Sequence, residues 1–261
     1  MKTVLITGAS SGIGKATASL LASKKEYRLI LCGRRKEKLI HLSQELNSRF
    51  ECENLILDFD IRDKDAVESA IVSIPDQFGK IDILVNNAGL ALGLDSIEEG
   101  NTEHWDTMID TNVKGLLYIS KFVSQIMKTN LSGHIINIGS TAGKEAYPKG
   151  NAYCASKFAV DGLTKAMRMD LFSYNIKVSQ IAPGHVENTE FAITRFEGDA
   201  QRAKIYEDFT PLQPADVADT IEFIITRPPH VMVHDVVLTS TQQASAIMID
   251  RTGRKYSLDQ V

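Results

Sequence analysis

Short apolar runs and longer amphipathic segments alternate along this chain. The runs at Val4 to Ile6 and Tyr27 to Cys32 are apolar throughout, which is typical of strands with both faces covered. The segments between such runs place apolar residues at helical spacing. Alternation of this kind predicts βαβ units, and therefore a parallel sheet with helices on both faces.

The predicted elements can be given by residue range. Strands are expected over 4–6, 27–32, 54–57, 81–85, 134–138, 176–181 and 236–238. Helices are expected over 13–24, 35–48, 63–74, 102–129, 151–174 and 214–226. No repeat or flexible linker divides the chain, so we expect one domain over 1–261. The polar stretch 187–211 interrupts the alternation, and we expect it to form a substrate lid because long insertions in compact domains are usually functional.

A glycine-rich turn, TGASSGIG, follows the first predicted strand. Gly8 allows a tight turn, Gly12 lets backbone N–H groups approach a pyrophosphate, and Gly14 lets the next helix pack closely on the sheet. An anion bound there would lie at the positive end of that helix. The strand–turn–helix context predicts a dinucleotide site, with a ligand-free glycine turn as the alternative.

Two arginines, Arg34 and Arg35, follow the second predicted strand. A protein that reads the free 2′-hydroxyl of NAD would place a carboxylate in this region. Guanidinium groups match a phosphate in charge and geometry, whereas a helix N-terminus is otherwise unfavourable for cations. The pair therefore predicts NADP(H) as the cofactor; the alternative is that both arginines only cover the helix start.

Tyr153 and Lys157 lie one turn apart on a predicted helix and share one face. An adjacent ammonium favours the phenolate, so the pair predicts a tyrosine that exchanges a proton with an alcohol or carbonyl oxygen. Ser140 follows the strand 134–138, at the edge where parallel sheets bind ligands, and could donate to the same oxygen. A surface pair and a helix-capping serine are the respective alternatives.

Two asparagines are also candidate residues of the predicted site. Asn87 follows the strand 81–85 and is expected at the same edge of the sheet. Asn112 lies inside the predicted helix 102–129, shortly before Gly115. A weak helix former beside a glycine predicts a kink that exposes carbonyl groups and holds a water.

Composition narrows the classes of function. The net charge is −4 and no basic stripe is present, which disfavours nucleic-acid binding. No apolar stretch is long enough for a membrane span or a signal peptide. The three cysteines lack paired spacing, so we expect reduced thiols, no metal site and a cytoplasmic location.

The combination of TGASSGIG, NNAG, Asn112, Ser140, the Tyr153–Lys157 pair and Pro183-Gly184 resembles the short-chain dehydrogenase/reductase family. The resemblance runs from Thr3 to about Thr239. It implies a doubly wound α/β Rossmann fold with a seven-stranded parallel sheet in the order 3-2-1-4-5-6-7. It also implies a catalytic tetrad, which consists of Asn112, Ser140, Tyr153 and Lys157.

The resemblance further implies which residues contact NADP. Asp60 and Ile61 match adenine contacts, Lys157 matches the residue that holds the nicotinamide ribose, and 183–189 would cover the nicotinamide. The full expected set is Gly8, Ser10, Ser11, Gly12, Ile13, Gly14, Arg34, Arg35, Asp60, Ile61, Asn87, Ala88, Gly89, Tyr153, Lys157, Pro183, Gly184, Val186 and Thr189.

Four longer stretches, LVNNAGLALGL, HWDTMIDTNVKGLLY, GHIINIGSTAG and PGHVENTEF, are similar to the NADP-dependent serine and 3-hydroxy acid dehydrogenases within that family. Such enzymes oxidise the 3-hydroxyl of small acids such as serine, allo-threonine or 3-hydroxyisobutyrate, and many are homotetramers. The chain departs from their pattern at Lys144-Glu145 and Glu187-Asn188, which flank the site and leave the substrate open.

An acidic substrate needs a cation in the pocket. We expect Arg195 in the lid to bind the carboxylate, while Ser140 and Tyr153 contact the reacting oxygen of the substrate. Lys144 and His185 are other candidates for the carboxylate, and a solvent-facing arginine is the alternative for Arg195. Competing functions are a 3-oxoacyl-carrier-protein reductase and an NADP(H) sensor without turnover. The tail 251–261 lacks periodicity and is expected to be mobile or to lie on a neighbouring subunit.

Overall fold

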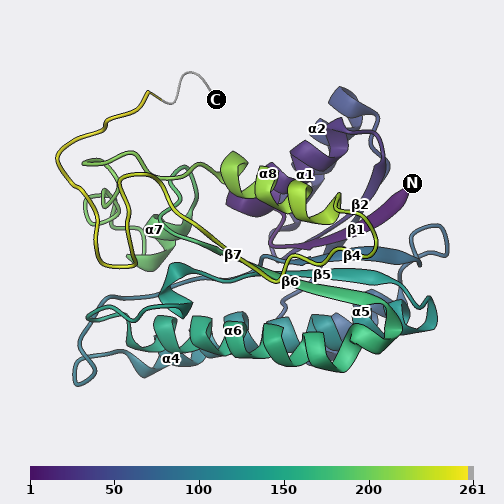
Figure 1. The fold of residues 1–261 in the computed structure, drawn as a ribbon, viewed down its shortest axis with the longest axis horizontal. Helices are drawn as coiled ribbons and strands as arrows, with labels where there is room; N and C mark the ends of the chain where they lie inside the picture. The colour runs from purple at the N-terminus through teal and green to yellow at the C-terminus, as the bar shows by residue number, and fades with distance from the viewer. Residues whose placement is uncertain (258–261) are drawn as a thin grey trace.

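A parallel sheet forms the centre of the computed structural model, which describes residues 1–257 (Figure 1). The seven strands found in this part of the chain follow the order β3-β2-β1-β4-β5-β6-β7, as the resemblance implies. Their bounds are β1 Lys2–Thr7, β2 Tyr27–Gly33, β3 Asn54–Asp58, β4 Ile81–Asn86, β5 Gly133–Ile138, β6 Ile176–Pro183 and β7 Asp235–Leu238. The order reverses between β1 and β4, where doubly wound sheets bind ligands.

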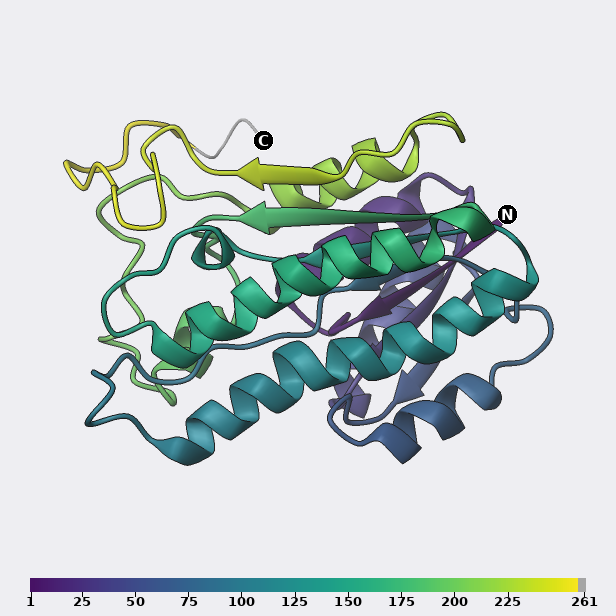
Figure 2. The ribbon, with the colours of Figure 1, turned by 60° about the horizontal axis from the view of Figure 1, so that its bottom comes forward.

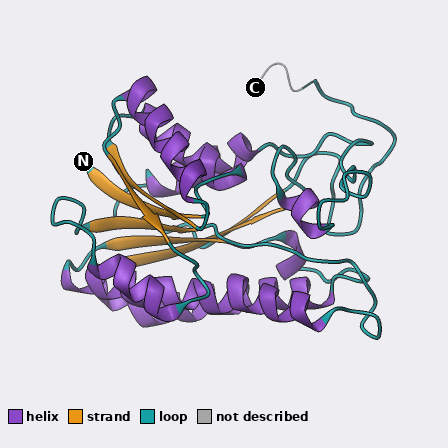
Figure 3. Cartoon of the chain, turned by 180° about the vertical axis from the view of Figure 1, so that it is seen from behind, coloured by secondary structure: helices purple, strands orange, loops and turns teal. Residues whose placement is uncertain are grey.

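Helices cover both faces of this sheet (Figure 3). One face carries α1 (Gly12–Ser23), α2 (Lys36–Phe50) and α8 (Pro214–Ile225). The other carries α3 (Lys64–Val72), the pair α4 (Thr102–Ile109) and α5 (Leu116–Thr129), and α6 (Asn151–Leu171). The long α4–α5 and α6 segments run side by side across that face (Figure 2).

The apolar strands have this composition because both sheet faces are buried. In β1, Val4 and Ile6 pack with α1, α2 and α8, whereas Leu5 between them packs with α3 and α5. All three side chains are fully buried. Successive side chains of the strand point to opposite faces of the sheet, and both faces are covered. The alternation therefore places side chains in two separate cores rather than in one core and in solvent.

The predicted kink near Asn112 is present as a π-helical segment, Asp110–Gly115, between α4 and α5. A π-helical turn inserts an extra residue and often occurs at functional sites. The helix expected over 151–174 ends its α-helical part at Leu171 and continues as a 3₁₀ turn over Phe172–Tyr174. Asn175 then stops it with a φ of 57°.

The segment 187–211 contains one short helix, α7 (Phe191–Arg195), which the sequence pattern did not predict. Residues 251–257 pack against this segment: Gly253 N–H donates to the Asp208 carbonyl, and Arg254 forms an ion pair of 2.5 Å with Glu187. Figure 1 shows this tail looping past α7. These contacts contradict the expectation of a mobile tail for 251–257, whereas contact with a neighbouring subunit stays a prediction; the remainder of the tail lies outside the described residues.

Three further observations concern membranes, metals and cysteines. No helix built from the described residues is long and apolar enough to cross a bilayer. Within 1–257, no group of three or more His, Cys, Asp or Glu could hold a metal ion. Cys32, Cys52 and Cys154 are buried free thiols.

Candidate active site

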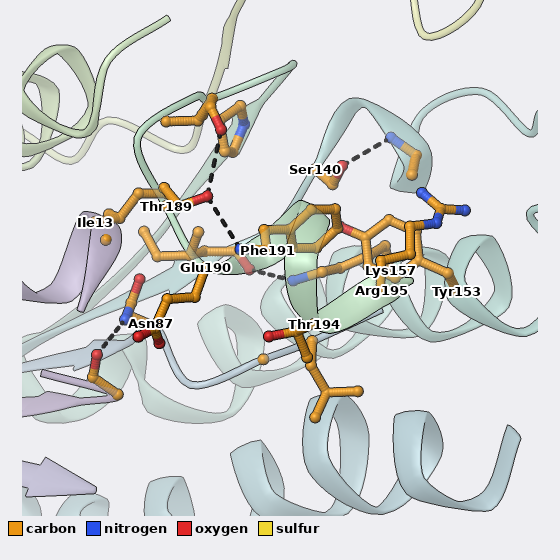
Figure 4. A pocket seen from close by; sticks show the side chains of 18 of the residues that line it. Ile13, Asn87, Ser140, Tyr153, Lys157, Thr189, Glu190, Phe191, Thr194 and Arg195 are labelled. Atoms are coloured by element: carbon orange, nitrogen blue, oxygen red, sulfur yellow. Dashed lines mark hydrogen bonds between the residues drawn. The ribbon is translucent and has the colours of Figure 1, made fainter. Parts of the chain in front are cut away.

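A cavity of about 720 Å³ opens at the carboxyl ends of the strands, with walls from the turns after β1, β2, β4, β5 and β6 (Figure 4). Almost every residue that the sequence assigned to the site lines it. These are Gly8, Ser10, Ser11, Gly12, Ile13, Arg34, Arg35, Asp60, Ile61, Asn87, Ala88, Gly89, Ser140, Tyr153, Lys157, Pro183, Gly184, Val186, Thr189 and Arg195. The exceptions are Gly14 and Asn112.

The glycine turn has the geometry that the sequence requires. Gly8 adopts a φ of 65°, which favours glycine. A Cβ on Gly14 would lie 2.4 Å from the Gly8 carbonyl oxygen, so only glycine lets α1 approach the turn this closely. Gly14 therefore packs against the backbone of the turn and does not line the cavity.

The start of α1 offers free donors to an anion. Its N-cap residue Ser11 makes no side-chain capping bond, and the first turn contains no acidic residue. Backbone N–H groups at a helix start need acceptors and carry partial positive charge. The close turn, these donors and the basic residues after β2 fit a dinucleotide phosphate.

Arg34 and Arg35 both reach the cavity from the end of β2, but they have different neighbours. Arg34 lies 3.7 Å from Asp60. Burial alone would raise the pKa of Asp60, but hydrogen bonds from Arg62 hold it below its usual value. Arg35 donates to the hydroxyl groups of Ser10 and Ser11, at 2.9 Å each.

The predicted catalytic groups meet at the other end of the cavity. Helix α6 carries Tyr153 and Lys157 on one face, and Ser140 caps the 3₁₀ turn after β5, with its oxygen accepting from the Ala142 N–H at 3.1 Å. Figure 4 shows Tyr153 and Lys157 together beside Phe191 and Arg195 of the segment 187–211. The capping interpretation of Ser140 is confirmed, and the same residue lines the cavity; its part in the reaction stays a prediction.

The ionisation of this cluster differs from the sequence-based prediction. Burial raises the pKa of Tyr153, the neighbouring Tyr147 adds to this, and Ser140 and Arg195 oppose it. Lys157 instead donates to the Ile138 carbonyl at 2.9 Å, and burial lowers its pKa to about 8. The predicted lowering of the Tyr153 pKa by Lys157 is not found, because burial of the phenol outweighs its neighbours.

Asn112 lies behind the cavity wall. Its amide donates to the Leu90 carbonyl at 2.8 Å and accepts from the Leu90 N–H at 2.9 Å. It also donates to Ser156 at 3.0 Å. A Cβ on Gly89 would lie 3.1 Å from the Asn112 oxygen and 3.6 Å from the Lys157 nitrogen. The side chain thus ties the π-helical segment to the turn beside Lys157.

Arg195, the cation that the sequence analysis proposed, is buried beside Tyr153. It is only 7% exposed, and its guanidinium lies 5.7 Å from the Tyr153 ring and 5.5 Å from the Tyr147 ring. Its Nε donates to the Gly93 carbonyl at 3.1 Å. No carboxylate of the described residues forms an ion pair with it. The alternative of a solvent-facing arginine is therefore wrong.

The two other cation candidates behave differently. Lys144 forms ion pairs with Asp161 and Asp235, at 2.5 Å each, and does not line the cavity. His185 lines it, and burial lowers the pKa of its ring, which favours the neutral form. Of these three candidates, Arg195 is the one that lines the cavity as a cation without a carboxylate partner among the described residues.

Sequence reasoning missed several aromatic walls of the cavity. Tyr147, Phe191 and Tyr206 surround the Tyr153 and Arg195 side chains. The Phe191 ring meets the Tyr153 ring edge-on, with centroids 5.6 Å apart. Tyr147 and Tyr206 lie in loops and Phe191 lies in α7, where no hydrophobic periodicity marks a functional position. Only the similarity of the stretch PGHVENTEF placed Phe191 near the site.

The comparisons with known proteins agree with this geometry. The family model described as short chain dehydrogenase matches residues 2–200. An NADP-dependent 3-hydroxy acid dehydrogenase of Schizosaccharomyces pombe is 41% identical, over 94% of this chain and 95% of that protein. Sulfoacetaldehyde reductase 2 of Chromohalobacter salexigens is 42% identical, over 95% and 98%.

A solved structure is similar over nearly the same length. The closed form of a serine dehydrogenase complexed with NADP⁺ has a TM-score of 0.88 and 39% identity, and the match covers 94% of this chain and 97% of that one. The similarity therefore spans nearly the whole length of both chains.

Proposed function

The chain belongs to the short-chain dehydrogenase family, and we propose that it transfers a hydride between NADP(H) and the 3-hydroxyl or 3-keto group of a small hydroxy acid. It is an NADP-dependent oxidoreductase that acts on CH–OH groups. The finer proposal names an acid such as serine, allo-threonine or 3-hydroxyisobutyrate as the substrate.

The position of Arg195 carries the choice of an acid. A buried guanidinium without an anionic partner is costly, and an anionic ligand offsets that cost. Its neighbour Tyr153 is the proposed acid–base residue. A short molecule that places its hydroxyl at Tyr153 and its carboxylate at Arg195 would satisfy both groups.

The chain's own residues would handle the proton, because NADP, when bound, supplies or accepts the hydride. Tyr153 would take the proton from the substrate hydroxyl during oxidation and return it during reduction. Ser140 would donate to the same oxygen and orient it. Arg195 and Ser140 favour the Tyr153 phenolate against its burial, and Lys157 is fixed one turn away by its hydrogen bond to the Ile138 carbonyl.

The lid would complete the site. Phe191 and Arg195 lie at the two ends of α7, so movement of the 187–211 segment would carry an aromatic wall and the guanidinium together. Closure over the substrate would exclude water and strengthen the ion pair. Asn112 is proposed to fix the turn beside Lys157. The π-helical segment that contains Asn112 is proposed to bind a water that links Lys157 to solvent.

A substrate panel tests this proposal. NADP⁺ reduction is followed by NADPH absorbance with serine, 3-hydroxyisobutyrate, their methyl esters and neutral alcohols. We expect the free acids to be oxidised with the highest kcat/KM. Preference for the esters, which lack the carboxylate, would refute the hydroxy-acid proposal but leave the oxidoreductase assignment intact.

A small sulfonate is the second candidate, because a guanidinium pairs with a sulfonate as with a carboxylate and one relative is named a sulfoacetaldehyde reductase. Isethionate in the same panel separates the two. An acyl-carrier thioester would reveal the carrier-protein reductase alternative, and NADPH binding without turnover of any substrate would indicate the sensor. Tetrameric assembly and a cytoplasmic location remain predictions, which light scattering and cell fractionation test.

A further inference from the structure

A lid carboxylate occupies the position at which we expect the cofactor's 2′-phosphate. Glu190, the residue before α7, lies 2.5 Å from the Arg35 guanidinium and 2.5 Å from the Lys38 ammonium. The two contacts link positions 155 and 152 residues apart in sequence. Glu190 also lines the cavity, beside Thr189 and Phe191 (Figure 4).

The donors around this carboxylate are those that a phosphate monoester needs. Arg35 contributes a planar guanidinium, and it also donates to the Ser10 and Ser11 hydroxyl groups. Lys38 adds a second cation, and the hydroxyl of Ser11 is a further partner of Glu190. Cations and hydroxyl donors at the end of β2 are typical of a site for a 2′-phosphate.

The contact is physically coupled to the substrate end of the cavity. Thr189, next to Glu190, lies over the phosphate turn: a Cβ on Gly12 would be 3.1 Å from its methyl carbon. After Glu190, the single short helix α7 leads to Arg195. A displacement of Glu190 would therefore shift the first part of the lid and the helix that carries the substrate cation.

We propose that Glu190 is an internal competitor of the 2′-phosphate: Arg35 and Lys38 hold the lid through it, and NADP(H) displaces it when its phosphate binds. Two anions cannot share these donors without repulsion. Glu190 thus lowers the affinity for the 2′-phosphate and makes the lid respond to NADP(H) but not to NAD(H). This inference rests on the NADP site of the proposed function.

Binding of cofactor fragments tests the proposal without any substrate. Isothermal titration measures adenosine 2′,5′-bisphosphate and 5′-AMP with the wild-type chain and Glu190→Gln. The ion pairs are about half exposed, so we expect the bisphosphate to bind about three- to tenfold more tightly to the variant, with 5′-AMP unchanged.

Two further variants isolate the effect. Glu45→Gln removes a charge that is also ion-paired, to Lys15 at 3.0 Å, but outside the cavity, and should leave both affinities unchanged. In an Arg35→Gln background, the gain from Glu190→Gln should shrink, because the two anions no longer compete for that guanidinium.

The lid supplies an independent readout. In the wild-type chain, the bisphosphate should increase hydrogen exchange of amides around Glu190, whereas in Glu190→Gln it should not. Weaker or unchanged binding of the bisphosphate by Glu190→Gln would overturn the proposal. A wild-type chain that does not distinguish the bisphosphate from 5′-AMP would refute the NADP site itself.

Discussion

Replacement of Arg195 tests whether the buried guanidinium selects acidic substrates. In Arg195→Gln the side chain keeps polar atoms but loses its charge and its planar fork of donors. One donor of the native side chain is used by the Gly93 carbonyl, and a hydrogen bond reaches Tyr147, which leaves further N–H groups for an anion. The variant therefore removes a buried cation that lies beside Tyr153 and has no carboxylate partner among the described residues.

The size of the effect follows from the burial of this group. A hydrogen bond to a charged partner contributes about 1.5–3 kcal/mol, which corresponds to a change of about 10- to 150-fold in kcat/KM. We expect this loss for 3-hydroxyisobutyrate and at most about a threefold loss for its uncharged methyl ester. Steady-state kinetics with both substrates, at saturating NADP⁺, measure the difference.

A second lid arginine supplies the matched control. Arg202 also lies over an aromatic ring, 4.6 Å from the Phe196 centroid, but it does not line the cavity. Arg202→Gln should leave the ratio of acid to ester turnover unchanged. Equal losses on both substrates in Arg195→Gln would refute the carboxylate role and assign Arg195 to lid stability instead.

Three further results are expected. Tyr153→Phe should lower kcat about 10²–10⁴-fold while NADPH still binds, because only the acid–base group is removed; near-normal turnover would contradict its role. Replacing Arg34 and Arg35 with Ala should raise the KM for NADPH far more than that for NADH, and equal effects would count against a 2′-phosphate site. Burial favours the neutral form of Asp161, but hydrogen bonds from Lys144 and other donors outweigh it and lower its pKa to about 2. Its charged form therefore stabilises the fold above about pH 4, and this contribution is lost as pH falls toward 2. Chemical denaturation of Asp161→Asn should show about 2 kcal/mol less stability at neutral pH and no deficit near pH 2, whereas a pH-independent deficit would contradict the linkage.

Features that depend on local spacing could be predicted from the order of the residues alone. Apolar runs predicted the strands, the glycine turn predicted a phosphate site at α1, and the four-residue interval between Tyr153 and Lys157 placed both on one face. The weak helix former Asn112 marked the π-helical segment. Each of these depends on backbone preferences over a few residues, which is why no distant contact was needed.

The contacts of the segment 187–211 and the ionisation of the site depend instead on the complete fold. Arg195 meets Tyr153, and Glu190 meets Arg35, across long sequence separations and through a segment without periodicity. The raised pKa of Tyr153 reflects burial by aromatic residues from several loops, which local spacing does not encode. Long-range packing sets burial, and burial sets the strength of every charge in this site.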